Sequence, residues 1–244
     1  MTPAEIQSWR KTMRHELLER RAALPRPTLE EYRHRIDIHL QRAFPDLAHG
    51  VIAFCWPYRN EYDARHLLAG LRRGGAVTAL PTIVAPRTPL VFREWHPGTV
   101  LEKGPLGIPF PPGGPELQPD SVLLPVVGFD AAGYRLGYGG GYFDRTLAAI
   151  ARRPRVIAVA YEMQFIESIH PQPHDIPVDY VVTERGAYVR LADGGLRFAD
   201  DPARGYSSPP CYAAEIAPDY FGETRAPDIG TAGAANRRHA PRDE

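Results

Sequence analysis

The sequence predicts a three-layer α/β protein in which helices cover both faces of a mainly parallel β-sheet, followed by a disordered C-terminal tail. Short apolar runs with strand character alternate with stretches whose apolar residues recur at helical spacing, which indicates βαβ units. Residues 199–244 contain no Leu, Val, Met or Trp, so they cannot bury enough surface to offset their ordering entropy. We therefore expect one domain over residues 1–198 and a tail over 199–244.

The first helix is expected over residues 3–23. Thr2 and Glu5 form a capping-box pattern with Pro3 at the first helical position, and Pro25 ends the segment. Its apolar stripe consists of Ile6, Trp9, Met13, Leu17 and Leu24. Similar spacing predicts further helices over residues 29–44, 64–72, 143–152 and 164–169.

Six apolar runs have the length and composition of buried strands. They cover residues 51–55, 76–80, 90–95, 122–127, 156–161 and 180–183. Because helical patterns separate several of them, these strands are expected to form one mainly parallel sheet.

Charge and composition exclude several classes of protein. The chain has 29 Lys and Arg residues against 29 Asp and Glu residues, and this balance argues against a general nucleic-acid binder. Two Cys residues cannot build a disulfide framework, and neither a signal peptide nor a membrane-spanning run is visible. We expect a cytoplasmic monomer with no membrane partner. The chain has only two Lys residues, Lys11 and Lys103, and Lys103 has no proposed role.

A glycine-rich segment precedes the helix expected from residue 143. Four of the five residues at 137–141 are Gly, which removes the Cβ atoms that would keep a ligand away from the backbone. A following helix start offers free N–H groups, so the segment fits a phosphate cradle. It is neither a Walker A motif nor GxGxxG, whose third Gly is replaced by Tyr142. The alternative is a strained turn, but Arg135 before the loop and Asp144 after it favour phosphate and Mg²⁺.

Residues 124–147 resemble the signature of 5-formyltetrahydrofolate cyclo-ligases, also called methenyltetrahydrofolate synthetases. That signature is a strand, Phe-Asp, a turn, and then Arg-Leu-Gly-x-Gly-x-Gly-Tyr-Tyr-Asp, and this chain carries it at 135–144 with Phe143 in place of the second Tyr. Residues 11–24, 56–63 and 177–180 resemble further segments of that family. The resemblance covers residues 3–188.

The resemblance implies an enzyme of one-carbon folate metabolism. Family members use Mg·ATP to phosphorylate the formyl oxygen of 5-formyltetrahydrofolate, with or without a polyglutamate chain. N10 then closes on the activated carbon and phosphate leaves, giving 5,10-methenyltetrahydrofolate and ADP. Such a reaction asks the protein mainly for positioning and charge neutralisation.

The resemblance also implies roles for individual residues. Nucleotide-binding residues would be Lys11, Arg14, Arg135, Leu136, Gly137, Tyr138, Gly139, Gly140, Gly141, Tyr142 and Phe143. Folate-binding residues would be Trp56, Glu61, Tyr138, Gly139, Gly140, Gly141 and Tyr142. Arg135 and Tyr142 are expected to take part in catalysis, and Asp144 and Asp179 to hold Mg²⁺. Some family members carry Lys or Arg where this loop has Tyr138 and Gly140, so Lys11, Arg14 and Arg135 must supply more of the positive charge.

Three alternatives are open. A metal-dependent hydrolase would use His170, His174, Asp175 and Asp179, although prolines between the two His exclude a helical zinc motif. Cys55 could be a nucleophile, but it lies in an apolar strand run and has no evident base. The third alternative is a catalytically silent folate- or nucleotide-binding module of the same fold. The joint presence of the six expected polar site residues argues against it; they are Lys11, Arg14, Glu61, Arg135, Asp144 and Asp179.

Overall fold

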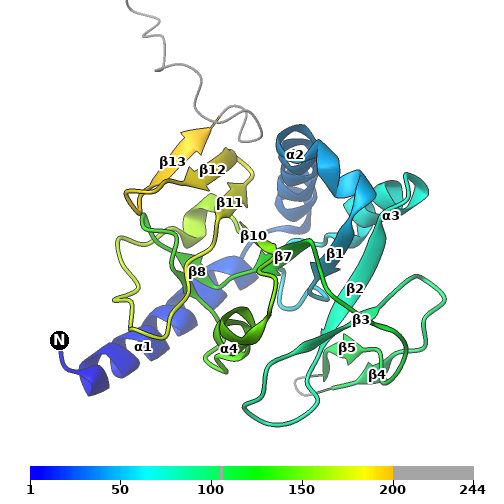
Figure 1. The fold of residues 1–244 in the computed structure, drawn as a ribbon. Helices are drawn as coiled ribbons and strands as arrows, with labels where there is room; N and C mark the ends of the chain where they lie inside the picture. The colour runs from blue at the N-terminus through cyan, green and yellow to red at the C-terminus, as the bar shows by residue number, and fades with distance from the viewer. Residues whose placement is uncertain (105–106, 200–244) are drawn as a thin grey trace, which may run out of the picture. The chain divides into compact units, whose positions relative to one another are not determined.

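The computed structural model describes residues 1–104 and 107–199 of the 244-residue chain. Within these residues lies a nine-stranded sheet in the order β13-β12-β11-β10-β7-β1-β2-β3-β6 (Figure 1). Its strands are β1 (Val51–Phe54), β2 (Val77–Thr82), β3 (Val91–Glu94), β6 (Glu116–Leu117), β7 (Ser121–Pro125), β10 (Arg155–Val159), β11 (Tyr180–Thr183), β12 (Gly186–Arg190) and β13 (Leu196–Ala199). The five central strands from β11 to β2 are parallel, and the outer strands are antiparallel. The expectation of a mainly parallel sheet is confirmed.

Helices cover both faces of this sheet. Side chains of β1 show the alternation directly, because Ile52 and Phe54 join one apolar cluster and Ala53 joins another. Helices α2 (Arg26–Ala43) and α3 (Arg65–Arg73) contribute to the first cluster. Helix α4 (Tyr142–Ala149) contributes Leu147 to the second. The predicted three-layer arrangement is therefore confirmed.

Helix α1 (Pro3–Ala22) lies beside the end of β7 (Figure 1). The predicted capping box is present, since the Thr2 N–H donates to the Glu5 carboxylate at 2.6 Å and the Glu5 N–H donates to Thr2 Oγ1 at 3.3 Å. Leu17 packs against Val127, Leu136 and Ile169 in a third small cluster. This packing fixes the polar side of α1 next to the segment that follows β7.

Short elements complete the described residues. Two-stranded sheets are formed by β4 (Glu102–Lys103) with β5 (Pro109–Phe110), and by β8 (Gly128–Phe129) with β9 (Arg135–Leu136). Two 3₁₀ turns are η1 (Pro45–His49) and η3 (Glu162–Gln164). Lys103 therefore lies in β4, with an exposed side chain.

Some predicted elements differ from the structure. The helix expected over 164–169 is wrong: only η3 forms, because the Gln164 side chain donates to the Val126 and Val127 carbonyls and accepts from the Tyr161 N–H. Strands β12 and β13 were not predicted, because three of the five β12 residues are only partly buried and two of the four β13 residues are exposed, so neither segment is a continuous apolar run. Helix α2 begins three residues earlier than expected, and α4 ends three residues earlier.

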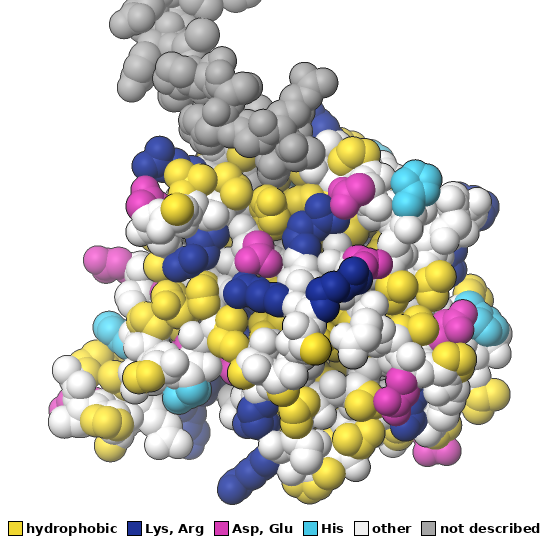
Figure 2. Space-filling view, in the orientation of Figure 1, with side chains coloured by type: hydrophobic (Ala, Val, Ile, Leu, Met, Phe, Trp, Pro, Cys, Tyr) yellow, Lys and Arg dark blue, Asp and Glu magenta, His cyan; other side chains and the backbone are white. Residues whose placement is uncertain are grey.

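The predicted tail over 199–244 lies outside the described residues, except that Ala199 ends β13. No helix within 1–104 or 107–199 is long and apolar enough to cross a membrane. On the face shown in Figure 2, Lys and Arg side chains are interspersed with acidic and apolar ones and do not form one continuous basic patch.

Candidate active site

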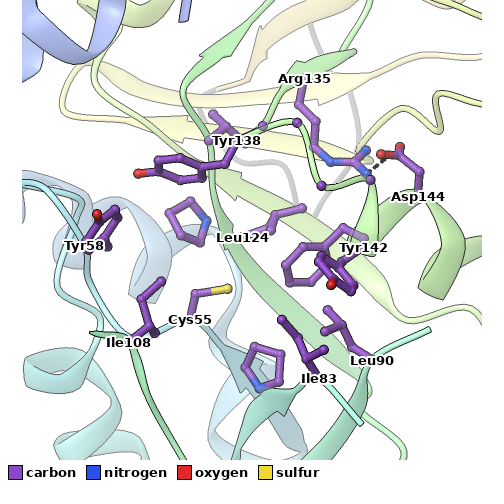
Figure 3. Close-up of a pocket in the computed structure, with 18 of the residues that line it drawn as sticks. Cys55, Tyr58, Ile83, Leu90, Ile108, Leu124, Arg135, Tyr138, Tyr142 and Asp144 are labelled. Atoms are coloured by element: carbon purple, nitrogen blue, oxygen red, sulfur yellow. Dashed lines mark hydrogen bonds and ion pairs between the residues drawn. The ribbon is translucent and has the colours of Figure 1, made fainter. Parts of the chain in front are cut away.

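A cavity of about 530 Å³ opens where the central strands end (Figure 3). Residues at the ends of β2 and β7 line it, as do Cys55, Trp56, Tyr58 and Glu61 after β1. The carboxyl ends of parallel strands meet at one edge of a sheet, and this edge is where ligands of open α/β proteins bind. The sheet topology thus places several loops around one space.

The glycine-rich loop forms another wall of the cavity. All residues from Arg135 to Asp144 line it. Gly139 (φ 94°) and Gly141 (φ 63°) adopt left-handed conformations that other residues rarely take, and Gly141 is the N-cap of α4. Because α4 begins at Tyr142, its first N–H groups lie next to the cavity wall, a favourable arrangement for an anion.

Arginines surround this end of the cavity. Arg14 Nε donates to the Gly137 carbonyl at 2.7 Å, which fixes the loop to α1. Burial and the nearby Arg10 lower the pKa of Arg14, and the negative charge of Asp175 opposes this effect. Arg135 is buried and donates to Asp144 Oδ1 at 2.7 Å and to the Ile176 carbonyl (Figure 3).

Two carboxylates line the same end. Asp144 also accepts a hydrogen bond from the Ile176 N–H at 3.2 Å. Asp175, the residue before Ile176, lines the cavity as well. Asp175 pairs with Arg10 Nη2 at 2.5 Å. Burial raises the pKa of Asp175, but bonds from Arg10 and from the Gln172 N–H outweigh that effect and leave the pKa below its usual value. Asp175 is therefore ionised at neutral pH.

Aromatic rings and Glu61 form the opposite part of the cavity. The Tyr138 hydroxyl donates to Glu61 Oε1 at 2.7 Å, and the Tyr58 N–H donates to Oε2 at 3.0 Å. Tyr58 and Tyr138 rings lie with centroids 5.8 Å apart. Burial raises the pKa of Glu61, which Arg21, Tyr138 and the Tyr58 N–H oppose. Apolar walls around a few fixed polar groups suit a flat heterocycle.

Most predicted site residues meet in this cavity. Those lining it are Arg14, Trp56, Glu61, Arg135, Leu136, Gly137, Tyr138, Gly139, Gly140, Gly141, Tyr142, Phe143 and Asp144. Lys11 is exposed and outside the lining. Asp179 is also outside it: its carboxylate accepts from the Val156 N–H at 2.8 Å and from Arg153 at 2.9 Å, at the amino ends of β10 and β11.

Two polar residues of this region, Arg10 and Arg21, were not among the predicted site residues, and Asp175 was considered only as a ligand in the metal-dependent hydrolase alternative. Arg10 and Asp175 line the cavity, and Arg21 lies directly behind it. Arg10 stands four residues before Arg14, a spacing that puts both on one side of a helix and that could have identified it. Asp175 has no comparable signal, since only the path of the chain decides which of the two late aspartates reaches the cavity.

The structure disfavours two of the alternatives. His170 packs edge-on against Trp9 with ring centroids 4.6 Å apart and is outside the cavity lining, which includes His174. Within residues 1–104 and 107–199, no three His, Cys, Asp or Glu side chains are grouped so as to hold a metal by themselves. Burial and the negative charge of Glu61 raise the pKa of Cys55, which opposes formation of a nucleophilic thiolate.

Fold and cavity together define an α/β protein with a ligand site at the carboxyl ends of its parallel strands. The model of the 5-formyltetrahydrofolate cyclo-ligase family matches residues 6–184. The chain belongs to this family, and the resemblance seen in the sequence is confirmed.

Relatives and solved structures agree with this assignment. The chain is 35% identical to the 5-formyltetrahydrofolate cyclo-ligase of Mycolicibacterium smegmatis, over 54% of this chain and 66% of that protein. It is 32% identical to the Escherichia coli K12 enzyme of the same name, over 56% of this chain and 79% of that protein. The Aquifex aeolicus 5,10-methenyltetrahydrofolate synthetase structure superimposes with a TM-score of 0.63 at 27% identity, covering 73% of this chain and 91% of that one. The Mycoplasma pneumoniae synthetase, at 24% identity and a TM-score of 0.59, shares the fold over 72% of this chain and 98% of its own.

Proposed function

We propose that the protein is an enzyme that converts 5-formyltetrahydrofolate and ATP to 5,10-methenyltetrahydrofolate, ADP and phosphate in a reaction that depends on Mg²⁺. One observation carries the proposal: a single cavity has a glycine loop, arginines and two carboxylates at one end, and Glu61 among aromatic rings at the other. Phosphoryl transfer needs the first set of groups, and recognition of a pterin needs the second. Family membership supports the same reaction.

At the phosphate end, the loop from Arg135 to Phe143 and the start of α4 would bind the triphosphate through backbone N–H groups. Arg14 and Arg135 would add side-chain charge, and Arg10 would support them from beside Asp175. Lys11, which the resemblance also implies, is exposed and lies outside the cavity lining, so we expect a smaller contribution from it.

Asp144 and Asp175 fit a Mg²⁺ ion bound together with phosphate oxygens. Mg²⁺ takes few protein ligands in such sites, commonly one or two carboxylates, and both of these lie beside the glycine loop. When bound, the ion would neutralise charge on the transferred phosphoryl group. The resemblance implies Asp179 as a ligand, but its position at the amino ends of the strands makes Asp175 the better second carboxylate.

At the other end, the Glu61 carboxylate would accept hydrogen bonds from N–H donors of the pterin, and the Trp56 and Tyr138 rings would contact its faces. The formyl group would then lie toward the loop. The chain's own residues would hold the formyl oxygen in line with the γ-phosphate, with Arg135 compensating negative charge and Tyr142 closing the wall between the two substrates. Phosphorylation makes that oxygen a leaving group, which allows N10 to close the ring and to release its proton.

The decisive experiment mixes the purified protein with 5-formyltetrahydrofolate, ATP and Mg²⁺ and follows the absorbance of the methenyl product. We expect product only when ATP and Mg²⁺ are both present, with one ADP released per turnover. Tight folate binding without ATP-dependent product would instead identify the catalytically silent module. We also infer that the protein is cytoplasmic and that it is a monomer. Size-exclusion chromatography with light scattering would check the oligomeric state.

A further inference from the structure

Arg21 is a buried arginine that does not line the cavity, with a side chain 1% exposed. Its guanidinium donates Nε to the Arg59 carbonyl at 2.9 Å, Nη1 to the Val126 carbonyl at 3.1 Å and Nη2 to the Tyr138 hydroxyl at 2.7 Å. A weaker bond reaches the Tyr58 carbonyl at 3.4 Å. One side chain of α1 thus joins the loop after β1, the end of β7 and the glycine loop.

The direction of these bonds is determined by chemistry. Arginine has donors only, so the Tyr138 oxygen accepts from Arg21 and must place its own single proton elsewhere. That proton goes to Glu61 Oε1 at 2.7 Å. Arg21 Nη2 also lies 3.6 Å from the same Glu61 oxygen. Arg21, Tyr138 and Glu61 therefore form an ordered chain that ends at the cavity.

The Glu61 carboxylate, 3% exposed, depends on its neighbours to stay ionised. Burial raises its pKa, and Arg21 is the largest opposing influence, followed by Tyr138 and the Tyr58 N–H. The other ionisable groups near it are Cys55 and Tyr161, whose pKa values are themselves raised, so both stay neutral. Arg21 is thus the cation on which the negative charge of Glu61 depends.

We propose that Arg21 is a positioning residue for folate recognition: it holds the Glu61 carboxylate and the Tyr138 phenol in the arrangement that receives the N–H donors of the pterin, without touching the substrate. The proposal rests on the proposed function and deepens it. It assigns the buried Arg to the folate end of the cavity, although Arg10 and Arg14 of the same helix lie at the phosphate end.

The test compares Arg21→Gln with Arg20→Gln, a matched control on the exposed side of the same helix. Arg21→Gln is expected to raise KM for 5-formyltetrahydrofolate by about tenfold or more, because a hydrogen bond to a charged group is lost. KM for ATP should change little, and Arg20→Gln should behave as the native protein. Equal folate KM values in the two variants, or equal increases of KM for both substrates in Arg21→Gln, would overturn the proposal.

Two readouts separate positioning from a general structural role. Without Arg21 the pKa of Glu61 should rise. The increase of folate KM on acidification should therefore begin at higher pH in Arg21→Gln than in the native protein. Arg21→Lys, which keeps a positive charge, should restore part of the native pH profile. In a Glu61→Gln background, Arg21→Gln should add little to folate KM, since its action passes through Glu61. A full additional effect in that background would show that Arg21 acts by another route.

A measurement independent of turnover keeps this idea distinct from the proposed function. The Glu61 carboxyl resonance, assigned by comparison with Glu61→Gln, can be titrated by NMR in the native protein and in Arg21→Lys or Arg21→Gln. A titration at higher pH in Arg21→Gln supports the ionic link even if the native protein fails to make methenyl product, and an unchanged titration rejects it even if the enzyme is active. Tyr138→Phe, which keeps the ring, should produce a smaller shift in the same direction and covers the case in which Arg21→Gln does not fold.

Discussion

Both edges of the parallel sheet carry Arg–Asp pairs, yet the pairs differ in what else they contact. At the amino edge, Asp120 accepts from the Val51 N–H at 2.9 Å and Asp179 from the Val156 N–H, so these carboxylates satisfy the backbone at strand starts. At the carboxyl edge, Asp144 and Asp175 pair with arginines and face a cavity. Asp144 and Asp175 also accept from backbone N–H groups, those of Ile176 and Gln172, so the two edges differ in what the carboxylates face: strand starts at one edge and the cavity at the other.

Asp175 and Asp179 show how sharply the chain separates these roles. The connection between the parallel strands β10 and β11 must run from the carboxyl edge back to the amino edge. Asp175 lies late on this path but still lines the cavity, and Asp179 immediately precedes β11. Asp175, which lines the cavity, and Asp179, which stabilises a strand start, are therefore only four positions apart in the sequence. Variants of the two residues test whether their roles differ in this way.

The largest expected effect is that of Asp144→Asn compared with Asp179→Asn. Asp144→Asn should lower the rate of methenyl formation by at least about a hundredfold, because charge stabilisation in phosphoryl transfer is lost. Asp179→Asn should keep nearly native activity and lose at most about 1 kcal/mol of stability, as expected for an exposed pair. Initial rates and melting curves of both variants decide the matter. Comparable activity loss in the two would return Asp179 to the metal site.

Asp175→Asn is expected to weaken the response to Mg²⁺ most clearly. Removing one of two proposed carboxylate ligands should raise the Mg²⁺ concentration needed for half-maximal rate by roughly tenfold. The measurement is a Mg²⁺ titration at saturating ATP and folate, with Asp179→Asn as the control. An unchanged titration curve would mean that Asp175 serves only as the partner of Arg10.

Arg14→Met should raise KM for ATP with little change in KM for folate. Arg14 fixes the glycine loop through Gly137 and supplies charge to the cavity, so a loss of about tenfold in ATP affinity is reasonable for a charged hydrogen bond. Arg153→Met, at the amino edge, is the matched control and should have no kinetic effect. The KM for ATP of Lys11→Met should lie between those of Arg14→Met and Arg153→Met. A Lys11 effect larger than that of Arg14 would contradict the geometry described above.

The smallest effect concerns stability and pH. The folded-state pKa of Asp175 lies below its unfolded value, so the stability that its charge contributes is present above about pH 4 and disappears as pH falls through the folded pKa. The difference in unfolding free energy between native protein and Asp175→Asn should therefore be several tenths of a kcal/mol near neutrality and vanish in acid. Urea unfolding at several pH values measures it, and a constant difference would indicate a role independent of charge.

Much of the fold follows from local patterns, and the gaps have physical reasons. Buried parallel strands are apolar on both faces and so stand out, whereas β12 and β13 are partly exposed. The helix expected over 164–169 fails because the Gln164 side chain replaces helical bonds with bonds to Val126 and Val127, the two residues that follow β7. Local propensity cannot anticipate such a contact across the sheet.

The site divides in the same way. The glycine loop, Glu61 and Asp144 could be located because each has a motif around it. Arg21 was overlooked although it occupies a position of the apolar stripe between Leu17 and Leu24, and a cation placed there must find buried partners. Which late aspartate enters the cavity depends on the crossover path, which no spacing rule specifies.

Helix α1 has a consequence for the length of the molecule that the cavity accepts. Arg14 touches the glycine loop at the phosphate end, and Arg21 governs Glu61 at the folate end. Seven residues of α-helix separate them, which is about 10 Å along the axis. Because both arginines belong to one helix, the proposed nucleotide and pterin sites would lie at a fixed separation before either substrate binds. The enzyme would then select substrates by length, because only a pair whose reacting atoms meet across this fixed separation could react.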